Sequence, residues 1–491
     1  MDGIVGIYGP NDRDMVSKAF FATGACQHRG KASTGLAIGT TKGIYVHKGL
    51  GRIAEVVDNR IINTFQGLGP LAAIGNIGYT KSSIAEKANS EPIEILPSKD
   101  SRYKIVLTMD GYLIKEDDLK EELENDYRFH TTNKTEIIGA LLHKYISEEG
   151  IRFEAGEKLL DRLRGRATFA LTALVYDGRE VILVTLNDSS AFEPFCYGTI
   201  DGAFIVSSES CSHRRLGGMI EREYDGSEMT ICSSSGIEIK RLREEPVMPD
   251  IFQGVYFGNV ASLFRGKEIF EIRRDLGLKL VYHYKTSKAD IVIPNPESGW
   301  GVSVGLAQGF GKGLFPALIK LPQAIRTFQE GERQARSKEV GLKFGGIDSI
   351  LKNKNIAMGD DSIVRGSVSE GGSIWVVYNA GAKYIEFWVS YGPMFFPSFK
   401  EWHRGIECLD ELAVQRAFQD DNPYDKNEDE INRAMAKLIG VDEVRYNSLE
   451  RIREVAGDGS FQALDASYPI AEKFWPAWLK IEVEKYHRYR S

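Results

Sequence analysis

The pattern of apolar residues changes at a polar join, residues 242–250, about half-way along this 491-residue chain. Before the join, short apolar segments alternate with Gly, Asn and Asp turn residues, a pattern typical of β-strands. After the join, strand patterns alternate with helical ones, which favours a mostly parallel sheet. Because a single compact core does not extend over so long a chain, we expect two or three domains.

The part before the join is expected to contain two sheets with helices outside them. Its apolar segments predict strands at 35–38, 44–47, 71–78, 105–109, 167–176, 181–186 and 204–208, and helices at 15–26 and 135–147. After the join, the pattern predicts helices at 269–284 and 372–380, and strands at 289–293, 355–358 and 384–390. The tail beyond residue 420 is expected to be helical.

Charge and cysteine content exclude several classes of protein. The net charge of -7 is spread along the chain, which argues against a nucleic-acid-binding surface and an anionic-membrane anchor. No apolar run approaches the roughly 20 residues that span a bilayer, and residues 1–5 lack the basic head of a signal peptide. The cysteines are few, odd in number and far apart, which predicts reduced thiols in a cytoplasmic protein without a zinc or iron–sulfur site. They are Cys26, Cys196, Cys211, Cys232 and Cys408.

The most informative segment is residues 356–369, where an apolar strand ends in two adjacent acids, Asp360 and Asp361. A loop with Gly and hydroxyl residues follows, and it leads toward a helix. Unpaired N–H groups and the dipole at a helix N-terminus favour phosphate. The two acids are placed to meet ribose hydroxyls or a hydrated magnesium ion, and Arg365 adds a fixed positive charge. An acidic turn with an ordinary N-cap is the alternative interpretation.

The run Asp-Asp-Ser-Ile-Val-Arg-Gly-Ser, from Asp360 to Ser367, closely resembles the phosphoribosyl-pyrophosphate loop of the glutamine phosphoribosylpyrophosphate amidotransferases. In the same half, residues 256–262 resemble the first strand of that family's second domain, 293–298 its pyrophosphate loop, and 326–343 the mobile loop that closes over the substrate. Residues 3–9 and 27–30 resemble class II glutamine amidotransferases. The resemblance covers nearly the whole chain.

This resemblance implies an α+β, N-terminal-nucleophile-hydrolase-like four-layer domain at 1–240, followed by an α/β type I phosphoribosyltransferase domain at 250–425. A C-terminal helical extension is expected at 426–491. The implied metal ligands are Asp360 and Asp361, which would hold Mg²⁺ together with phosphoribosyl pyrophosphate. The implied substrate-binding residues are Asp360, Asp361, Ser362, Ile363, Val364, Arg365, Gly366, Ser367, Ser369, Glu297, Ser298, Arg326 and Lys343.

The second half also departs from the family. Asn295 replaces a small hydroxyl residue, Gln323 stands where the mobile loop carries a tyrosine, and residues 399–403 are altered. Retained phosphate chemistry therefore does not guarantee turnover. The cysteines that hold an iron–sulfur cluster in some relatives are missing from 397–399 and 460–468, so no cluster is expected.

The family hydrolyses glutamine with an N-terminal cysteine whose own α-amine serves as the base, but Asp2 stands at that position. A carboxylate cannot replace a thiolate as an acyl acceptor. Removal of the initiator Met requires a small second residue, so Asp2 is expected to keep Met1 and no free α-amine forms. The pocket is therefore predicted to lack both its nucleophile and its base.

Four further positions of the glutamine pocket are changed. Lys81 replaces the arginine that binds the glutamine carboxylate. A lysine ammonium lacks the two parallel N–H donors with which a guanidinium binds a carboxylate. Asp110 replaces the oxyanion-hole asparagine and repels an oxyanion. Lys134 replaces the acid that pairs with the glutamine α-amine, and residues 187–189 read Asn-Asp-Ser in place of Arg-Asp-Pro. We expect no glutaminase activity.

Two hypotheses follow. The chain is either an amidophosphoribosyltransferase homologue of purine biosynthesis that forms 5-phosphoribosylamine from ammonia, or a non-catalytic regulatory subunit that pairs with an active paralogue. A homo-oligomer or a hetero-oligomer with that paralogue is expected, without nucleic-acid or membrane partners. An amidotransferase for sugar or asparagine chemistry is disfavoured, because those enzymes use other C-terminal folds.

Overall fold

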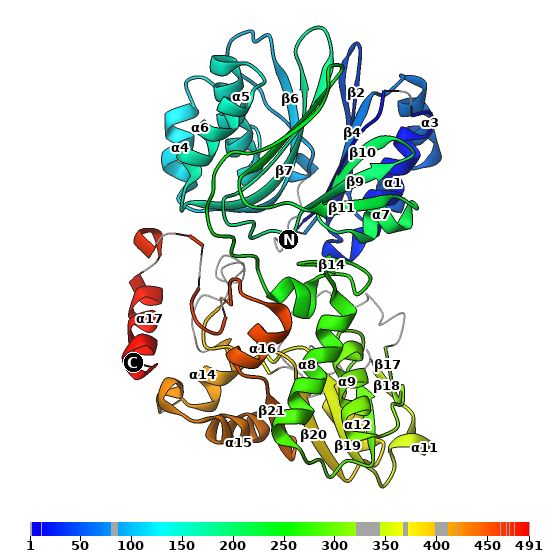
Figure 1. Cartoon of the computed structure of the whole chain (residues 1–491), viewed down its shortest axis with the longest axis vertical. Helices are drawn as coiled ribbons and strands as arrows, with labels where there is room; N and C mark the ends of the chain where they lie inside the picture. Colours follow the sequence, from blue (N-terminus) through cyan, green and yellow to red (C-terminus); the bar gives the residue numbers. More distant parts are fainter. Residues whose placement is uncertain are drawn as a thin grey trace. The chain divides into compact units, whose positions relative to one another are not determined.

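A computed structural model describes residues 2–10, 12–79, 87–320, 344–366, 372–397, 411–419, 421–461, 463–467, 469–470, 472–475 and 477–490. These residues form two compact units (Figure 1). Unit 1 comprises Met1–Asp250, Gly258–Gly266 and Pro469–Trp475; unit 2 comprises Ile251–Phe257, Lys267–Tyr468 and Pro476–Ser491. Among the described residues, every helix is too short or too polar to cross a bilayer.

Unit 1 contains two antiparallel sheets. A seven-stranded sheet has the order β11-β9-β10-β1-β4-β2-β3, and a six-stranded sheet has the order β13-β12-β8-β7-β6-β5. The strands of the first are β1 (Gly3–Tyr8), β2 (Ser33–Thr40), β3 (Gly43–Leu50), β4 (Ala72–Gly78), β9 (Cys196–Ile200), β10 (Ala203–Ser207) and β11 (Met219–Glu223). Those of the second are β5 (Ile93–Glu94), β6 (Lys104–Leu113), β7 (Ala167–Tyr176), β8 (Val181–Asn187), β12 (Glu228–Ser233) and β13 (Gly236–Arg241).

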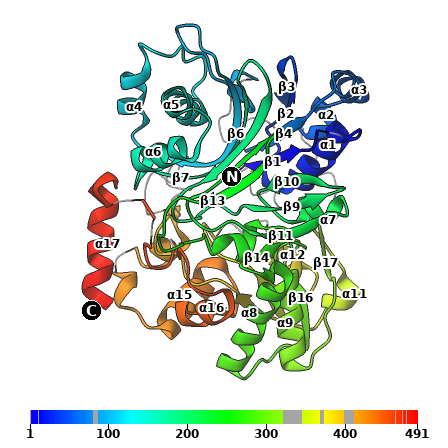
Figure 2. The same cartoon turned by 45° about the horizontal axis from the view of Figure 1, so that its top comes forward.

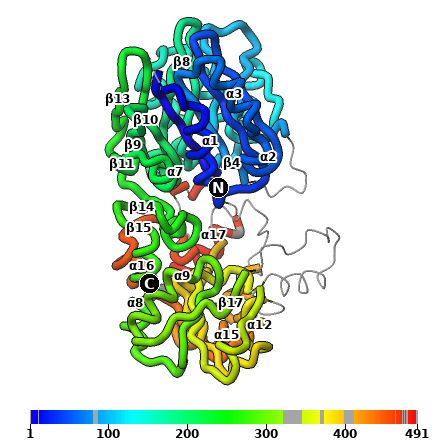
Figure 3. The backbone as a smooth tube through the Cα atoms, turned by 90° about the vertical axis from the view of Figure 1, so that its right-hand side faces the viewer, coloured from blue at the N-terminus to red at the C-terminus, as the bar shows by residue number. Residues whose placement is uncertain are grey.

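The two sheets pack face to face, because apolar side chains from both form one buried cluster that includes Ile74 and Leu174. The outer faces are covered by helices. The outer face of the six-stranded sheet is covered by α4 (Glu116–Leu123), α5 (Lys134–Glu149) and α6 (Phe153–Leu163) (Figure 2). The seven-stranded sheet carries α1 (Met15–Ala25), which lies beside β4, with α2 (Ile53–Val56), α3 (Asn59–Gly67) and α7 (Cys211–Arg215) (Figure 3). The result is a four-layer α/β/β/α arrangement.

Unit 2 is built on a parallel four-stranded sheet of order β16-β19-β20-β21. Its strands are β16 (Ile291–Pro294), β19 (Asn355–Asp360), β20 (Tyr384–Val389) and β21 (Glu443–Tyr446), and β17 (Leu318–Lys320) pairs separately with β18 (Phe344–Gly346). The helices are α8 (Ile269–Tyr284), α9 (Trp300–Phe310), α11 (Asp348–Leu351), α12 (Ser373–Asn379), α14 (Ala413–Ala417), α15 (Glu428–Ile439), α16 (Leu449–Ala456) and α17 (Ala477–Arg490). Apolar side chains of α8 and α9 pack on β16, β19 and β20 and bury the middle of the sheet. This burial explains the continuous apolar run of β19.

The structure differs from the sequence-based expectations in two places. The tail expected as a helical extension also supplies β21, which pairs in parallel with β20. Its four residues, Glu443–Tyr446, are too few and too polar for a clear strand pattern. Residues 256–262, expected as a strand, do not form one, and Tyr256 and Phe257 end a π-helical turn, Gln253–Phe257. The Tyr256 and Phe257 rings of this turn lie 4.9 Å apart and are tilted by 58°, so they pack against each other rather than on opposite faces of a sheet.

Candidate functional site

In unit 1, the residue before β1 is tied to the end of β6. The Asp2 backbone N–H donates to Asp110 Oδ1 at 2.8 Å, and the Asp2 side chain accepts from the Tyr79 N–H at 2.9 Å. Asp110 is 1% exposed, so its carboxylate is withdrawn from solvent. Both groups therefore take part in fixed contacts where the family pocket would need a nucleophile and an oxyanion donor.

Arg29 balances the charge of this cluster. Its guanidinium lies 2.7 Å from Asp110 Oδ2 and 2.7 Å from Glu209 Oε1, while its Nε donates to the Asp2 carbonyl at 2.7 Å. All three charged side chains are at most 3% exposed. Burial opposes the charged form of Arg29, but the adjacent carboxylates outweigh it and raise the Arg29 pKa further.

Glu209 anchors the other side of the cluster. His28 Nε2 lies 2.8 Å from Glu209 Oε1, and Oε2 accepts from the Asn259 N–H at 2.7 Å and the Ser262 hydroxyl at 2.9 Å. Burial alone would raise the Glu209 pKa, but His28 and Arg29 outweigh it and hold the pKa well below the usual range. Burial likewise opposes charge on His28, and Glu209 overcomes it and raises the His28 pKa. The cluster is thus a closed ion-pair network.

The other altered pocket residues serve structural contacts. Lys134 Nζ donates to the Leu113 carbonyl at 2.8 Å, lies 3.1 Å from Glu116 Oε1, and sits over the Tyr112 ring. In the changed run 187–189, Asn187 Nδ2 donates to the Asp225 carbonyl at 2.8 Å, and its Oδ1 accepts from the Glu228 N–H at 2.9 Å. The unchanged Asp188 accepts from the Phe169 N–H at 3.0 Å, and burial raises its pKa. Lys81 lies outside the described residues.

The cysteines of unit 1 lie away from solvent. The four cysteines in the described part of the chain are free and buried. Cys26, the nearest in sequence to Asp2, is fully buried with its Sγ 3.2 Å from the Ser212 hydroxyl.

In unit 2, the two predicted acids lie where expected, at the C-terminal end of the central strand β19. Asp360 and Asp361 are 4% and 5% exposed. Burial, and then the neighbouring Asp361 charge, raise the pKa of Asp360 well above the usual range. A ligand that supplies positive charge or hydroxyl donors here would favour the ionised pair.

The adjacent strand β16 brings the predicted pyrophosphate loop to the same place. Asn295 Nδ2 donates to Asp360 Oδ2 at 2.6 Å, and Ser298 Oγ lies 3.4 Å from Asp360 Oδ1. The Asn295 Oδ1 atom is buried and has no hydrogen-bond partner among the residues that the structure describes. Asn295, noticed in the sequence only as a departure from the family, is therefore a direct neighbour of the acid pair.

Two glycines permit this close approach. A Cβ on Gly299 would lie 2.1 Å from the Gly359 carbonyl oxygen, and one on Gly359 would lie 2.4 Å from Ser303 Oγ. The start of α9 can therefore pack directly on the end of β19.

The remaining predicted residues are only partly brought together. Ser362 donates to Asp361 Oδ1 at 2.6 Å, Ile363 is buried, and the Val364 carbonyl accepts from the Ala413 N–H. Arg365 pairs with Glu411 at 3.0 Å, and Gly366 has a left-handed φ of 64° that turns the loop. The Glu297 carboxylate points to Lys320, 3.6 Å away, rather than to the acids. Ser367, Ser369, Arg326 and Lys343 lie outside the described residues.

Comparison with known proteins finds relatives that match nearly the whole chain. The family described as "Glutamine amidotransferase domain" matches residues 82–212. The amidophosphoribosyltransferase of Archaeoglobus fulgidus is 29% identical over 479 residues, covering 96% of this chain and 98% of the relative. That of Methanocaldococcus jannaschii is 27% identical over 493 residues, with 96% and 98% covered. Over nearly its whole length the chain is therefore similar to amidophosphoribosyltransferases.

Solved structures agree with this assignment. A structure described as "the allosteric regulatory enzyme of purine biosynthesis" superposes with a TM-score of 0.80 at 24% identity, covering 97% of this chain and 98% of the other. The Bacillus subtilis glutamine phosphoribosylpyrophosphate amidotransferase, complexed with ADP and GMP, superposes with a TM-score of 0.78 at 22% identity and covers 97% and 98%. The predicted fold class is confirmed: a four-layer N-terminal-nucleophile-hydrolase-like domain and a type I phosphoribosyltransferase domain.

Glu91 is a buried acid of unit 1 that the sequence analysis missed. It is 3% exposed, and its carboxylate accepts from the Thr135 hydroxyl at 2.5 Å, the Met109 N–H at 2.8 Å, and the side-chain amides of Asn133 and Asn76. Burial and then the Asp2 charge raise the pKa of Glu91 to about 7. A carboxylate beside a proline, in Ser90-Glu91-Pro92, gives no signal of this burial.

Replacing Arg29 with Met tests the ion-pair network. The buried Asp110 carboxylate then loses its cation, so we expect the free energy of unfolding to fall by about 3–5 kcal/mol, measured by urea unfolding. Adding Asp110→Asn should recover part of that loss. Arg60→Met is the matched control, because the Arg60 side chain is 91% exposed beside Asp58, and it should change stability by less than about 0.5 kcal/mol. Equal stability of the two single variants would exclude the structural role of Arg29.

The raised pKa of Glu91 predicts a pH dependence of stability. The folded state holds its proton up to about pH 7, whereas the unfolded chain releases it near the ordinary value of 4.5. Stability is therefore full below about pH 4.5 and falls as the pH rises to about 7, by about 3 kcal/mol. Unfolding curves of the wild type and Glu91→Gln across this range measure the effect, and the variant should lack this component. Identical pH profiles would show that Glu91 is ionised in the folded state.

Proposed function

We propose that unit 2 binds magnesium–phosphoribosyl pyrophosphate and that unit 1 has lost its glutaminase, so that the chain forms 5-phosphoribosylamine from ammonia. One contrast supports the proposal. The acid pair Asp360–Asp361 stands at the end of the central strand. Asp110, predicted to replace the oxyanion donor, is paired with Arg29 and accepts from the N–H of Asp2, which is predicted to replace the nucleophile.

In the proposed complex, Asp360 and Asp361 accept hydrogen bonds from the two ribose hydroxyls. Backbone N–H groups of the loop from Ser362 to Gly366 face the 5′-phosphate, and the left-handed Gly366 turns that loop. By family resemblance, Ser367, Ser369, Arg326 and Lys343 complete the phosphate contacts. The bond from C1 of the ribose to pyrophosphate breaks with its electron pair leaving on pyrophosphate, and the ammonia nitrogen bonds to C1 and then loses a proton to solvent.

The donor set at the acid pair fits magnesium. Mg²⁺ prefers oxygen ligands and commonly uses one or two carboxylates together with substrate oxygens and waters. Asp360 and Asp361 offer two adjacent carboxylates, and no group of three His, Cys, Asp or Glu residues in the described part of the chain could hold a metal without the substrate. Bound magnesium would offset the charge of the pyrophosphate leaving group.

The residues at the former amide-cleaving position cannot perform acyl transfer. Asp110 offers two acceptor oxygens where a tetrahedral oxyanion needs donors, and both oxygens are already engaged by Asp2 and Arg29. The Asp2 carboxylate is a poor acyl acceptor and is held by the Tyr79 N–H. We propose that this pocket has become structural.

Purified full-length protein tests the proposed activity. With phosphoribosyl pyrophosphate, magnesium and ammonium, it should release pyrophosphate well above the uncatalysed rate. Asp360→Asn and Asp361→Asn should each lower that rate by at least about tenfold, because each removes an acceptor of a charge-assisted hydrogen bond. The control Asp429→Asn, at an exposed position of α15, should keep the wild-type rate. No release above background would remove the enzymatic proposal.

The second candidate is a non-catalytic subunit that binds phosphoribosyl pyrophosphate and pairs with an active paralogue. The Asn295 hydrogen bond favours it, because it occupies Asp360 Oδ2, one of the oxygens that the substrate would use. In this case the chain binds the ligand without turnover and co-purifies with a cysteine-initiated homologue. Full ammonia-dependent activity of the isolated homo-oligomer would exclude it. In both cases we place the protein in the cytoplasm.

A further inference from the structure

A cavity of about 260 Å³ lies at one edge of unit 1. Part of its wall comes from β3, the last strand of the seven-stranded sheet, and part from β5, the last strand of the six-stranded sheet. The polar residues that line it are His47, Lys48, Lys87, Glu94 and His130. Pockets that hold drug-sized molecules begin at about 300 Å³, so this cavity suits a smaller ligand.

Lys48 is half-buried in the cavity wall because a glycine stands beside it. Gly35 of β2 pairs directly with Lys48 of β3. A Cβ on Gly35 would lie 2.2 Å from the Glu91 carbonyl oxygen and 2.8 Å from Lys48 Cβ. The lack of a side chain at position 35 therefore lets the segment around Glu91 and Pro92 pass close over β2 and cover the stem of Lys48.

The Lys48 amino group forms no ion pair with the residues that the structure describes. Its Nζ donates to the Ser90 carbonyl at 2.6 Å and to the Ala88 carbonyl at 3.3 Å. Both contacts need only N–H donors, and a neutral amine supplies two of them while it keeps its lone pair. These contacts are therefore compatible with the uncharged, nucleophilic form of the side chain.

The surrounding charges also favour that form. Burial lowers the pKa of Lys48, and the positive charge of Lys87 acts in the same direction. Glu91, Glu136 and Glu94 act in the opposite direction, but burial outweighs them. A lysine whose pKa is lowered and which lines a cavity is a typical nucleophile toward carbonyl groups.

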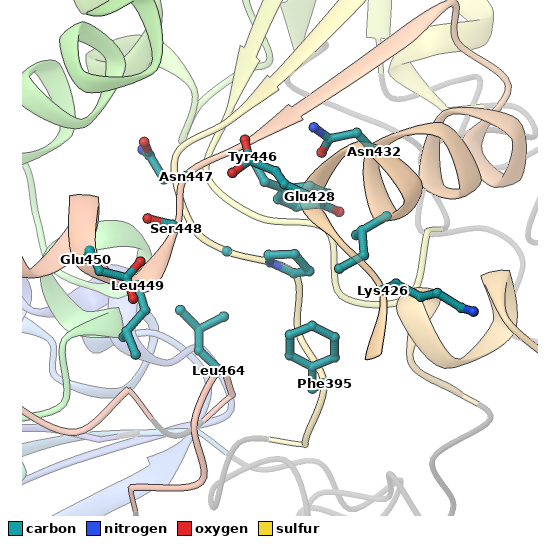
Figure 4. A pocket seen from close by; sticks show the side chains of 13 residues that line it. Phe395, Lys426, Glu428, Asn432, Tyr446, Asn447, Ser448, Leu449, Glu450 and Leu464 are labelled. Carbon is teal, nitrogen blue, oxygen red and sulfur yellow. The ribbon is translucent and has the colours of Figure 1, made fainter. Parts of the chain in front are cut away.

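Lys426 shows the contrasting arrangement in unit 2, where it lines a cavity of about 140 Å³ (Figure 4). Its ammonium lies 2.6 Å from Asp421 Oδ2 and 3.6 Å from Asp425 Oδ1. The hydrogen bond to Asp421 raises the pKa of Lys426, so this side chain stays charged at neutral pH. Both lysines line a cavity, but only the contacts of Lys48 favour a neutral amine.

The other polar groups of the cavity at β3 favour a ligand that carries negative charge. Lys87 is exposed, and it pairs with no carboxylate in the described part of unit 1. One acid of the lining, Glu94, stands against two lysines. His130 Nδ1 lies 2.6 Å from Glu136 Oε1, which orients the ring and leaves Nε2 to exchange a proton near neutral pH.

We propose that this cavity binds a small aldehyde that carries a phosphate group, and that Lys48 joins the aldehyde covalently as an imine. The lone pair of Lys48 Nζ forms a bond to the carbonyl carbon, and the carbonyl oxygen then leaves as water with the two amine protons. His130 transfers a proton to that oxygen, and Lys87 pairs with the phosphate. The step needs no oxidant or reductant. Protonation of the imine restores one N–H for the Ser90 carbonyl.

Treatment of the full-length protein with pyridoxal 5′-phosphate and then with borohydride tests this proposal, because borohydride reduces an imine to a stable secondary amine. Peptide mass spectrometry then locates the label. We expect saturable labelling of Lys48, at least about tenfold stronger than that of Lys426, since each unit of pKa changes the neutral fraction about tenfold. Pyridoxal, which lacks the phosphate, should label Lys48 at least about threefold more weakly.

Two variants provide the controls. Lys48→Arg keeps the charge and the N–H donors but has no neutral amine, so it should remove this label from folded protein. Lys87→Met should lower the labelling of Lys48 by pyridoxal 5′-phosphate about threefold and leave labelling by pyridoxal unchanged. Thermal unfolding verifies that the variants are folded, and the comparison of Lys48 with Lys426 in the wild type holds even if one of them is not.

Three results would each overturn the proposal. The first is labelling of Lys48 in the wild type that is no stronger than that of Lys426 or does not saturate. The second is equal labelling of Lys48 by the two aldehydes. The third is labelling by pyridoxal 5′-phosphate that is unchanged in folded Lys87→Met.

Discussion

In unit 1, the buried guanidinium of Arg29 offsets the charge of the buried carboxylates around it. Arg29 contacts Asp110, Glu209 and the Asp2 carbonyl at 2.7 Å each, and the two carboxylates are at most 3% exposed. Two buried negative charges without a cation would carry a desolvation cost of several kcal/mol per ion. An aspartate at position 110 is compatible with the four-layer fold because Arg29 and the Asp2 N–H use both of its oxygens. The same contacts occupy both carboxylate oxygens of Asp110, and the proposed loss of amide cleavage rests on them.

In unit 2, the buried carboxylates are held by hydrogen bonds and not by a described cation. Asp360 and Asp361 are adjacent and buried, and their described contacts are hydrogen bonds from Asn295, Ser298, Ser362 and the Asp361 N–H rather than from a cation. The pKa of Asp360 is raised because burial and the neighbouring acid both disfavour its charge. Two adjacent buried carboxylates without a cation destabilise the fold, so the pair is better explained as a ligand site. There the hydroxyls of a ligand and a divalent cation would supply the missing hydrogen-bond donors and positive charge. In unit 1, Arg29 offsets the charge of the buried carboxylates. In unit 2, no described cation offsets the charge of Asp360 and Asp361. The proposed division of function rests on this difference.

Much of this could be predicted from the sequence, for identifiable reasons. Period-two and continuous apolar runs predicted β6, β7, β8 and β19 because burial on one or both faces dictates those residues. The acid pair was found because it follows a buried strand directly. Glu91 could not be predicted, since its burial depends on Thr135, Asn133 and Met109, which are distant in sequence. The ion pair of Lys134 could likewise not be predicted, because its partner Glu116 lies on a different helix, α4.

The central claim is that the sugar-phosphate site persists while amide cleavage is lost. Calorimetric titration of the full-length protein with magnesium–phosphoribosyl pyrophosphate, with glutamine present throughout and glutamate assayed in the same sample, tests it most directly. The account predicts saturable heat from the phosphoribosyl ligand and no glutamate above a protein-free control. Glutamate formation, or the absence of any heat of binding, would contradict it.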